Sequence, residues 1–273
     1  MTDYEYVLDN TWKAAQDRLA QLEGMFNPWS IRHLCEVGVD AGWKCLELAA
    51  GGGSIAGWLC RRVGPGGQVV AMDLEPRLLG ALAMPNLRVE RHNILTDPLP
   101  ENAFDLVHAR ALLTFLSEPK QVIRKMVSAL KPGGWLLLEE PDYISAIPDP
   151  SMTAEAIELS RKGWDALFSH LKSRGYDTAL GRHLYYDVIA TGLTEVKAEG
   201  LVPMQLGGTP TARFWRITFE QVQSELLAAG LLTESEAGEY IRLLESSEYR
   251  WLSPTVMSVW GRRRLAGQED VKN

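Results

Sequence analysis

The sequence predicts an α/β fold: a mostly parallel sheet of seven strands with helices on both faces, an N-terminal helical cover and a helical lid after the fifth strand. Two observations support this prediction. Short apolar runs alternate with helical patterns between residues 44 and 139, which is typical of parallel sheets. The alternation then stops until about residue 194, which indicates an insertion after the fifth strand.

The segment before the first strand is expected to form two helices. Residues 3–23 place apolar side chains near one face and charges on the other. A second, short helix over Trp29–Val37 is expected after a break at Asn27-Pro28. This cover could pack against the sheet, or it could serve as a flap or as a contact between copies of the chain.

The central segment is expected to supply five strands whose carboxyl ends share one edge of the sheet. A helix over Ser54–Val63 follows the first strand, with Ser54 as its N-cap, and a helix over Lys120–Leu130 precedes the fifth strand. Ligands in such sheets bind beyond the carboxyl ends of the strands. The predicted strands are Lys44–Leu48, Gln68–Met72, Leu87–Arg91, Phe104–His108 and Trp135–Glu139.

Beyond residue 142 the prediction continues with two lid helices, over 152–173 and 181–191. A sixth strand is expected near Glu195–Pro203 and the last over Thr255–Arg262, with helices Phe219–Ala229 and Glu234–Ser246 between them. This organisation gives four segments. They are the N-terminal cover 1–40, the core 41–142, the lid 143–193, and a completion of the core sheet over 194–273.

Composition narrows the classes of partner. The 273 residues carry a net charge of −7, and the densest basic run, Arg262 to Arg264, is expected to be a solvated strand end, so nucleic acid is not an expected partner. Three widely spaced cysteines suit neither a zinc knuckle nor a disulfide framework. The chain shows neither a signal-peptide pattern nor an apolar run near the ~18 residues of a membrane helix. We therefore expect a cytoplasmic protein without a membrane partner.

The most specific feature is a glycine turn paired with an acid. Residues 46–53 read Leu-Glu-Leu-Ala-Ala-Gly-Gly-Gly, and Asp73 ends the next apolar run. In a βαβ unit such a turn admits a ligand to the backbone, and the acid can bind a ribose diol. Glu47 would repel a pyrophosphate, which argues against a nicotinamide dinucleotide. It suits S-adenosylmethionine (SAM), which has an ammonium, a sulfonium and no phosphate.

With these residues the chain resembles the class I SAM-dependent methyltransferases, especially the small-molecule enzymes of bacterial natural-product pathways. Their motif E-x-G-x-G-x-G stands here as Glu47-Leu-Ala-Ala-Gly51-Gly-Gly53, with Ala49 in place of the first glycine. The resemblance runs from Trp43 to Asp142 and more weakly to Arg264. It implies a Rossmann-like sheet with an antiparallel last strand. It also implies methyl transfer from SAM, which leaves S-adenosyl-L-homocysteine (SAH).

The resemblance also implies roles for residues at the carboxyl edge. Asp73 would bind the ribose hydroxyls and Asn93 the adenine amino group. Glu47 would bind the methionine end or the loop, and Arg110 the carboxylate of the methionine moiety or an anionic substrate. The expected cofactor-binding set is Glu47, Ala49, Gly51, Gly53, Asp73, Leu74, Asn93, Ile94, Ala109 and Arg110.

The catalytic group is not identified by the sequence. Candidates for a general base are His108, Glu140, His170 and His183, each of which could equally be structural. The resemblance implies no metal, because the Asp-Asn pair of the metal-dependent catechol methyltransferases is missing after the fifth strand.

Lid aromatics Trp164, Phe168 and Tyr186 suggest an aromatic or apolar small-molecule acceptor, methylated at N, O or C. Methylation coupled to cyclisation, or replaced by it, is the alternative. A non-catalytic SAM-binding subunit and a nicotinamide dehydrogenase are weaker readings. A homo-oligomer formed through the N-terminal helix is also expected.

Overall fold

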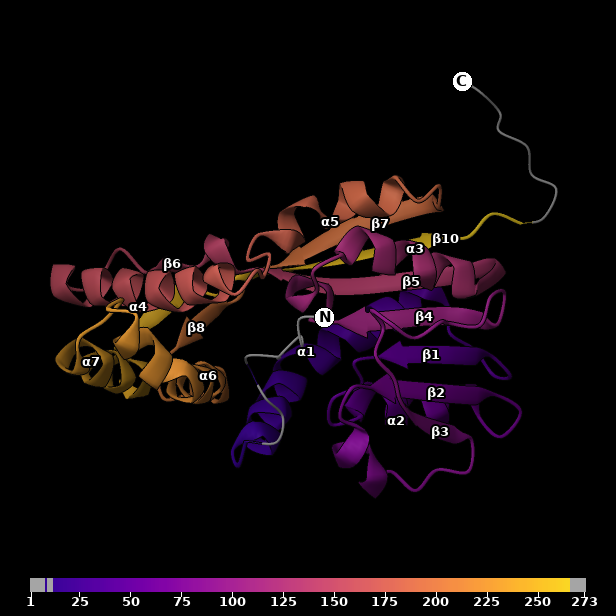
Figure 1. Ribbon diagram of the computed structural model, residues 1–273, viewed down its shortest axis with the longest axis horizontal. Helices are drawn as coiled ribbons and strands as arrows, with labels where there is room; N and C mark the ends of the chain where they lie inside the picture. The colour runs from indigo at the N-terminus through magenta and orange to yellow at the C-terminus, as the bar shows by residue number, and fades with distance from the viewer. Residues whose placement is uncertain (1–7, 9–11, 266–273) are drawn as a thin grey trace. The chain divides into compact units, whose positions relative to one another are not determined.

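The structure is a computed structural model that describes residue 8 and residues 12–265 (Figure 1). The chain forms two compact units. The sheet unit comprises residues 29–140, 180–200 and 257–273, and the helical unit comprises residues 1–28, 141–179 and 201–256. The predicted four-segment organisation stays a prediction, and these contact-based units divide the chain at other positions.

The sheet unit is built on a seven-stranded sheet in the order β3-β2-β1-β4-β5-β10-β7. The pairs β1–β2, β2–β3, β1–β4 and β4–β5 are all parallel. This confirms the predicted fold class. The strands are β1 (Lys44–Leu48), β2 (Gln68–Asp73), β3 (Leu87–Arg91), β4 (Phe104–Arg110), β5 (Leu130–Asp142), β7 (Thr194–Leu201) and β10 (Thr255–Arg262).

The direction of β10 follows from its hydrogen bonds. Gly133 N donates to Arg263 O at 2.9 Å, and Arg263 N donates to Gly134 O at 2.8 Å. The beginning of β5 therefore lies beside the end of β10, so β10 is antiparallel to β5, as the resemblance implied. Thr194 Oγ1 donates to Arg262 O at 3.1 Å, so β7 begins where β10 ends and runs parallel to β5.

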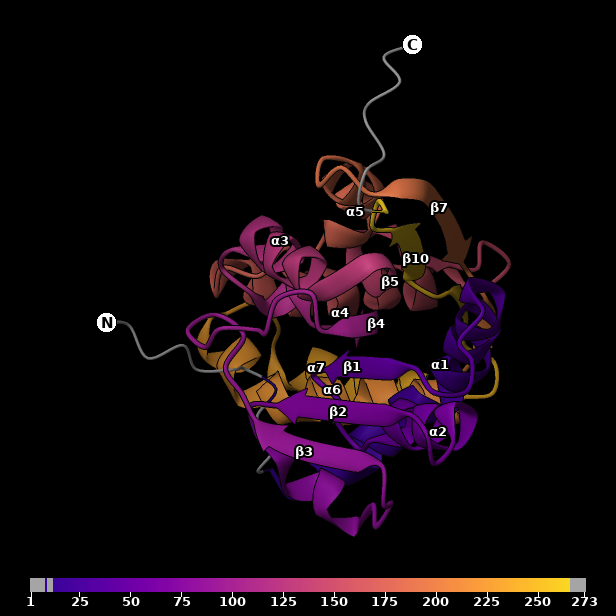
Figure 2. The same ribbon diagram turned by 90° about the vertical axis from the view of Figure 1, so that its right-hand side faces the viewer.

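Helices cover both faces of this sheet (Figure 2). On one face α3 (Pro119–Ala129) and α5 (Leu180–Ile189) pack against alternate residues such as Leu46 and Val107. On the other, α2 (Ser54–Val63) and the second half of α1 (Ala15–Val37) pack against the intervening residues, such as Cys45 and Leu106. The period of two along each strand therefore decides which face a side chain occupies.

Among its described residues, the helical unit holds the first half of α1, three complete α-helices and a small sheet. The helices are α4 (Ala154–Ser173), α6 (Pro210–Ala228) and α7 (Glu234–Glu245). The antiparallel sheet has the order β6-β9-β8 and consists of β6 (Ile147–Pro148), β8 (Met204–Leu206) and β9 (Arg250–Leu252). Strands of two or three residues carry no alternation, which is why the sequence did not predict them. Short 3-10 turns complete the fold: η1 (Pro76–Ala81), η2 (Leu113–Phe115) and η3 (Tyr143–Ser145).

The predicted break at Asn27-Pro28 is wrong, because α1 continues through Pro28. An interior proline forgoes one backbone hydrogen bond and costs about 3 kcal/mol. Beyond it, the burial of Leu34 and Val37 and the hydrogen bond from Ser30 to Glu139 act in the opposite direction. The beginning of the predicted helix 3–23 lies outside the described residues.

Two further local predictions differ from the structure. Helix α2 begins at Ser54, so its N-cap is Gly53, at φ 82°, and not Ser54. The segment predicted as a second lid helix forms α5, which belongs to the sheet unit. The physical reason is its apolar stripe, since Leu180, Leu184 and Val188 are fully buried in the same core as α3.

Candidate functional site

The turn between β1 and α2 brings three residues into the left-handed region. Ala49, Gly51 and Gly53 have φ values of 52°, 56° and 82°. A Cβ atom on Gly53 would lie 2.7 Å from Leu79 Cδ2 and even closer to Leu82, so no larger residue fits without displacing these side chains. Gly53 is therefore required by its backbone conformation and by close packing against Leu79 and Leu82, whereas Gly51 is half-buried.

Asp73 is joined directly to this turn. Its Oδ2 accepts a hydrogen bond from Gly51 N at 2.9 Å, and its Oδ1 accepts one from Glu75 N at 2.9 Å. The carboxylate is 8% exposed. Burial raises its pKa, and the two backbone N–H groups act in the opposite sense. Each carboxylate oxygen keeps a second lone pair, so the group can still accept hydroxyl donors from a ligand.

Asn93 follows β3 and shapes a turn. Its Oδ1 accepts from Leu95 N at 3.1 Å, and its backbone N donates to Asp97 Oδ2 at 2.8 Å. Sequence reasoning missed Asp97; the contact of Asn93 with the backbone two residues on is the usual turn signal. Of the neighbouring predicted residues, Ile94 is buried and Leu74 is 45% exposed.

Glu47 and His108 form a buried pair on adjacent strands. They are opposite each other in the β1–β4 register, and His108 Nδ1 lies 2.6 Å from Glu47 Oε2. His108 Nε2 lies 3.3 Å from Glu139 Oε2 on β5. Burial alone would lower the pKa of His108, but the Glu47 charge and hydrogen bonds to Glu139 and Glu47 outweigh it and raise this pKa to about 9.

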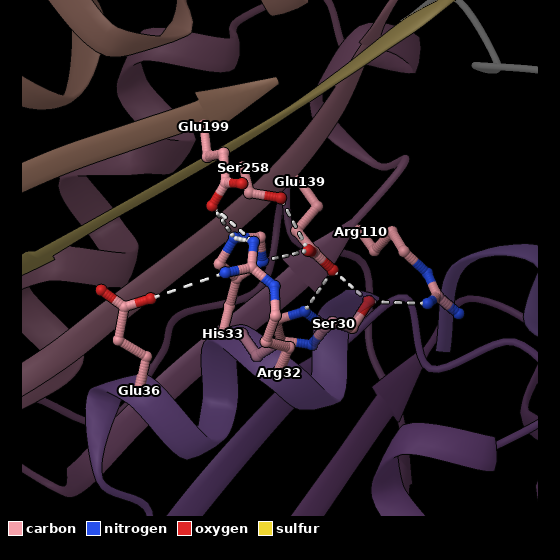
Figure 3. Close-up of polar contacts among 9 residues, drawn as sticks. Ser30, Arg32, His33, Glu36, Arg110, Glu139, Glu199 and Ser258 are labelled. Atoms are coloured by element: carbon pink, nitrogen blue, oxygen red, sulfur yellow. Dashed lines mark hydrogen bonds and ion pairs between the residues drawn. The ribbon is translucent and has the colours of Figure 1, made fainter. Parts of the chain in front are cut away.

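Glu139 is the centre of this cluster (Figure 3). It accepts hydrogen bonds from Ser30 on α1 and from Ser258 on β10, the latter at 2.8 Å. His33 Nδ1 lies 3.4 Å away. Burial favours the neutral acid, but hydrogen bonds from His108 and His33 prevail and hold the pKa of Glu139 well below its usual range.

Arg110, at the end of β4, belongs to the same cluster. Its Nη1 donates to Ser30 Oγ at 2.8 Å, which links it to Glu139. The preceding Ala109 is fully buried. Sequence reasoning missed Ser30, His33 and Ser258, because nothing in their local patterns shows that α1 and β10 meet at Glu139.

The carboxylate of Glu140, the next residue of β5, also accepts hydrogen bonds from the protein itself. Its carboxylate accepts from Leu112 N at 2.9 Å, Leu113 N at 2.7 Å and Thr114 N at 3.2 Å. Burial, only partly offset by these donors, raises its pKa to about 7. These hydrogen bonds fix the position of the segment that follows β4.

His170 and His183 each contact a carboxylate within their own unit. His183 Nδ1 contacts Asp187 Oδ2 at 2.8 Å, and Asp187 also binds Lys120 Nζ at 3.0 Å, all within the sheet unit. His170, in the helical unit, has its Nε2 3.0 Å from Glu225 Oε2. Both histidines therefore have carboxylate partners of their own.

A cleft of about 360 Å³ lies within the helical unit. The rings of Trp164 and Phe168 stack at 5.3 Å, and that of Phe168 stacks on Tyr143 at 5.1 Å. These three side chains line the cleft together with Asp165 and Lys172. The predicted partner Tyr186 is not among them: it lies on α5 in the sheet unit and is 71% exposed.

The described residues hold neither a metal-binding cluster nor a membrane-spanning helix. Within residue 8 and residues 12–265, no cluster of three or more His, Cys, Asp or Glu side chains is arranged to hold a metal ion. Over the same residues, no helix combines the length and the apolar character needed to span a bilayer.

Comparisons with known proteins agree with this geometry. Residues 46–138 match the model of a methyltransferase domain family. Methyltransferase str2 from Strobilurus tenacellus is 29% identical over 146 residues, covering 52% of this chain and 50% of that protein. The ubiquinone/menaquinone biosynthesis C-methyltransferase UbiE of Pseudomonas putida is 34% identical over 125 residues, covering 43% and 49%. The chain thus spans about half the length of these curated relatives.

Solved structures share the fold. Haemonchus contortus phosphoethanolamine N-methyltransferase 2, solved with phosphomonomethylethanolamine and SAH, superposes with a TM-score of 0.58 at 15% identity. The match covers 97% of this chain and 61% of that one. The methyltransferase domain model matched by residues 46–138, the strand order with its reversed β10, and the glycine turn joined to Asp73 together confirm the resemblance to the class I SAM-dependent methyltransferases.

Proposed function

We propose that this protein binds SAM at the carboxyl edge of its sheet and transfers the methyl group to a small-molecule acceptor. The observation that carries the proposal is the direct hydrogen bond between Asp73 and Gly51. This bond joins an acid at the end of β2 to the half-buried Gly51 of the turn, which supports a ribose-binding role for Asp73. The relatives' names and the SAH-containing structural neighbour support the same cofactor.

The proposed contacts follow the strand ends. Asp73 accepts the ribose hydroxyls, and Gly51 and Gly53 allow the cofactor to approach the backbone, with Ala49 at the first glycine position. Glu47 and Arg110 carry opposite charges, which suit the ammonium and the carboxylate of the methionine moiety. Ala109 lies beneath that moiety. Leu74 and Ile94 cover the adenine, and Asn93 bonds its amino group.

The acceptor is proposed to be aromatic or apolar. The cleft lined by Tyr143, Trp164 and Phe168 offers stacked rings to such a molecule, and its rim carries Asp165 and Lys172. Str2 is named only as a methyltransferase, and UbiE is named for C-methylation in quinone biosynthesis. These names leave the acceptor atom of this chain open among N, O and C.

The mechanism is a direct transfer in which the acceptor atom attacks the sulfonium methyl in line. The protein's share is positioning, and effective molarities of well-oriented reactants reach on the order of 10⁵ M or more. Among the base candidates, the carboxylate of Glu140 already accepts three backbone N–H groups, and His108 already contacts two carboxylates. We therefore assign no general base to either residue.

Calorimetric titration with SAM, SAH and NADH tests the cofactor. We expect micromolar binding of SAM and SAH by the wild type, and a loss of about 10- to 100-fold in Asp73→Asn, because a hydrogen bond to a charged group is lost. Glu75→Gln is the matched control, since Glu75 is a nearby acid that caps η1. Binding of NADH in place of SAM would contradict the proposal.

Paired variants test the acceptor cleft. Phe168→Leu removes a ring that lines the cleft, whereas Phe219→Leu removes a fully buried ring of α6 that does not. We expect the first to weaken binding of an aromatic acceptor and to leave SAM binding intact, and the second to leave both intact. Equal losses of acceptor and SAM binding in Phe168→Leu would contradict this assignment.

Two finer proposals need their own measurements. Cyclisation in place of methylation would give a product with the mass of its substrate, so mass spectrometry of the product separates the two reactions.

Association through the N-terminal helix predicts a lower mass by light scattering when residues 1–25 are removed. An unchanged mass would contradict that proposal.

A further inference from the structure

A row of polar side chains crosses four adjacent strands beneath α1. Glu47, His108, Glu139 and Ser258 come from β1, β4, β5 and β10, and all are less than 5% exposed. They share the sheet face on which Cys45, Leu106 and Leu137 pack against α1 and α2. Ionisable groups are rarely buried in such a core unless they are paired.

The two contacts of His108 require a particular protonation state. Its Nδ1 faces Glu47 and its Nε2 faces Glu139, at 2.6 and 3.3 Å. An ionised carboxylate only accepts hydrogen bonds, and a neutral imidazole donates from one nitrogen alone. Both contacts can therefore be hydrogen bonds to carboxylates only when His108 carries two N–H groups and a positive charge.

We propose that His108 is a positioning residue: as an imidazolium held between Glu47 and Glu139, it keeps the carboxylate of Glu47 oriented toward the amino group of SAM. The inference rests on the proposed function, in which Glu47 receives the methionine end of the cofactor. Glu47 lies two residues before Ala49, the first residue of the glycine turn. A change in the position of Glu47 is therefore expected to change the position of the turn.

The surroundings of the imidazolium favour its charge. Glu47 faces it from β1 and Glu139 from β5. Glu139 is further held by Ser30 and His33 of α1 and by Ser258 of β10, and Arg110 donates a hydrogen bond to Ser30. The direct neighbours of His108 therefore supply two negative charges, consistent with a pKa raised to about 9 although burial opposes it.

The proposal predicts that SAM affinity depends on pH through His108. When one proton leaves at about pH 9, a single N–H remains for two carboxylates, so the donor to Glu47 is shared with Glu139 and is no longer fixed. We expect SAM affinity to fall across this range. Titration of the amine of SAM itself affects every variant alike. A fall in SAM affinity that is seen in wild type and is missing when His108 is replaced is therefore due to His108.

The experiment is calorimetric titration of wild type, His108→Gln, Glu139→Gln and Ser258→Ala with SAM between about pH 7 and pH 10. At pH 7 we expect His108→Gln to bind SAM about 10- to 100-fold more weakly, the loss typical of a hydrogen bond to a charged group, and to lack the step near pH 9. Ser258→Ala is the matched control, because Ser258 binds Oε1 of Glu139, the oxygen remote from His108, and we expect less than about a threefold change.

The outcomes separate the two claims. If wild type does not bind SAM, the proposed function is wrong. If wild type binds and His108→Gln binds equally with the same pH profile, the proposed function stands and the positioning role is wrong. If His108→Gln does not fold, the Glu139→Gln variant provides the test. The pH at which its SAM affinity falls must be lower than in wild type, since one of the two carboxylates that hold the proton of His108 is gone. An unchanged pH contradicts the proposal.

Discussion

The two units of this chain bury different kinds of side chain. In the sheet unit, Glu47, Asp73, His108 and Glu139 are all less than 10% exposed and lie at or near the carboxyl ends of strands. In the helical unit the largest fully buried side chains are the rings of Trp251, Tyr240 and Tyr249. The helical unit also buries Arg18, Asp142 and His170, so the two units differ in their main buried cluster. This difference agrees with the proposal that the sheet unit binds the charged cofactor and the helical unit the apolar acceptor.

This comparison matches the two reactants of the proposed reaction. A cofactor with an ammonium, a sulfonium and a carboxylate needs fixed charges around it, whereas an aromatic acceptor needs flat apolar walls. If this division is correct, a substitution in one unit should change the stability or binding of that unit and leave the other unchanged.

The stability of the sheet unit should depend on pH through His108. Its pKa is raised from 6.5 to about 9 in the folded protein, so the stabilisation is complete below about pH 6.5 and is lost as the pH rises through 9. At about 1.4 kcal/mol per pKa unit this amounts to roughly 3 kcal/mol. Urea unfolding of wild type and His108→Gln at several pH values measures it. A difference between the two proteins that does not shrink between pH 7 and 9 would contradict the assignment.

Gly163→Ala should disturb the helical unit alone. A Cβ atom there would lie within 2.6 Å of several ring atoms of the fully buried Tyr240, and overpacking of this kind typically costs about 1–3 kcal/mol. Gly238→Ala on α7 is the control, because its Cβ would approach only Arg242 Nη1, at 3.8 Å. Thermal unfolding should show the loss in Gly163→Ala only, with SAM affinity unchanged in both. A joint loss of SAM affinity would break the separation of the units.

Gly53→Ala should disturb the cofactor site. Its φ of 82° costs an alanine about 1–2 kcal/mol, and the new Cβ would also press on Leu79 and Leu82. Gly38→Ala separates the two effects, because Gly38 has a similar φ of 85° with nothing within 4 Å. We expect similar backbone strain in both variants and weaker SAM binding in Gly53→Ala only. Equal SAM affinity in the two variants would contradict the placement of the cofactor at this turn.

Ala49→Gly should have the smallest effect. Ala49 adopts φ 52°, which glycine adopts freely, but glycine also loses more entropy on folding. We expect stabilisation of at most about 1 kcal/mol by chemical denaturation, with unchanged SAM affinity. Destabilisation would show that the methyl group of Ala49 makes a packing contribution.

The sequence predicted the sheet unit far better than the helical unit. Strands β1 and β3 and helix α2 have the predicted bounds, because each apolar run is closed by glycine, proline or charged residues and its pattern is local. The pairing of Asp73 with the glycine turn followed from the geometry of a βαβ unit. The charged cluster at Glu139 did not, since Ser30, His33 and Ser258 come from distant segments that meet only after folding.

The most direct test of this account is hydrogen–deuterium exchange of the wild-type protein with and without SAH. We predict slower exchange at three loops of the sheet unit, the glycine turn 49–53, residues 73–75 and residues 93–95, while the cleft-lining residues 164–179 of the helical unit keep their exchange rates. Protection confined to the helical unit, or the same protection produced by NADH, would contradict the assignment of the SAM site to the sheet unit.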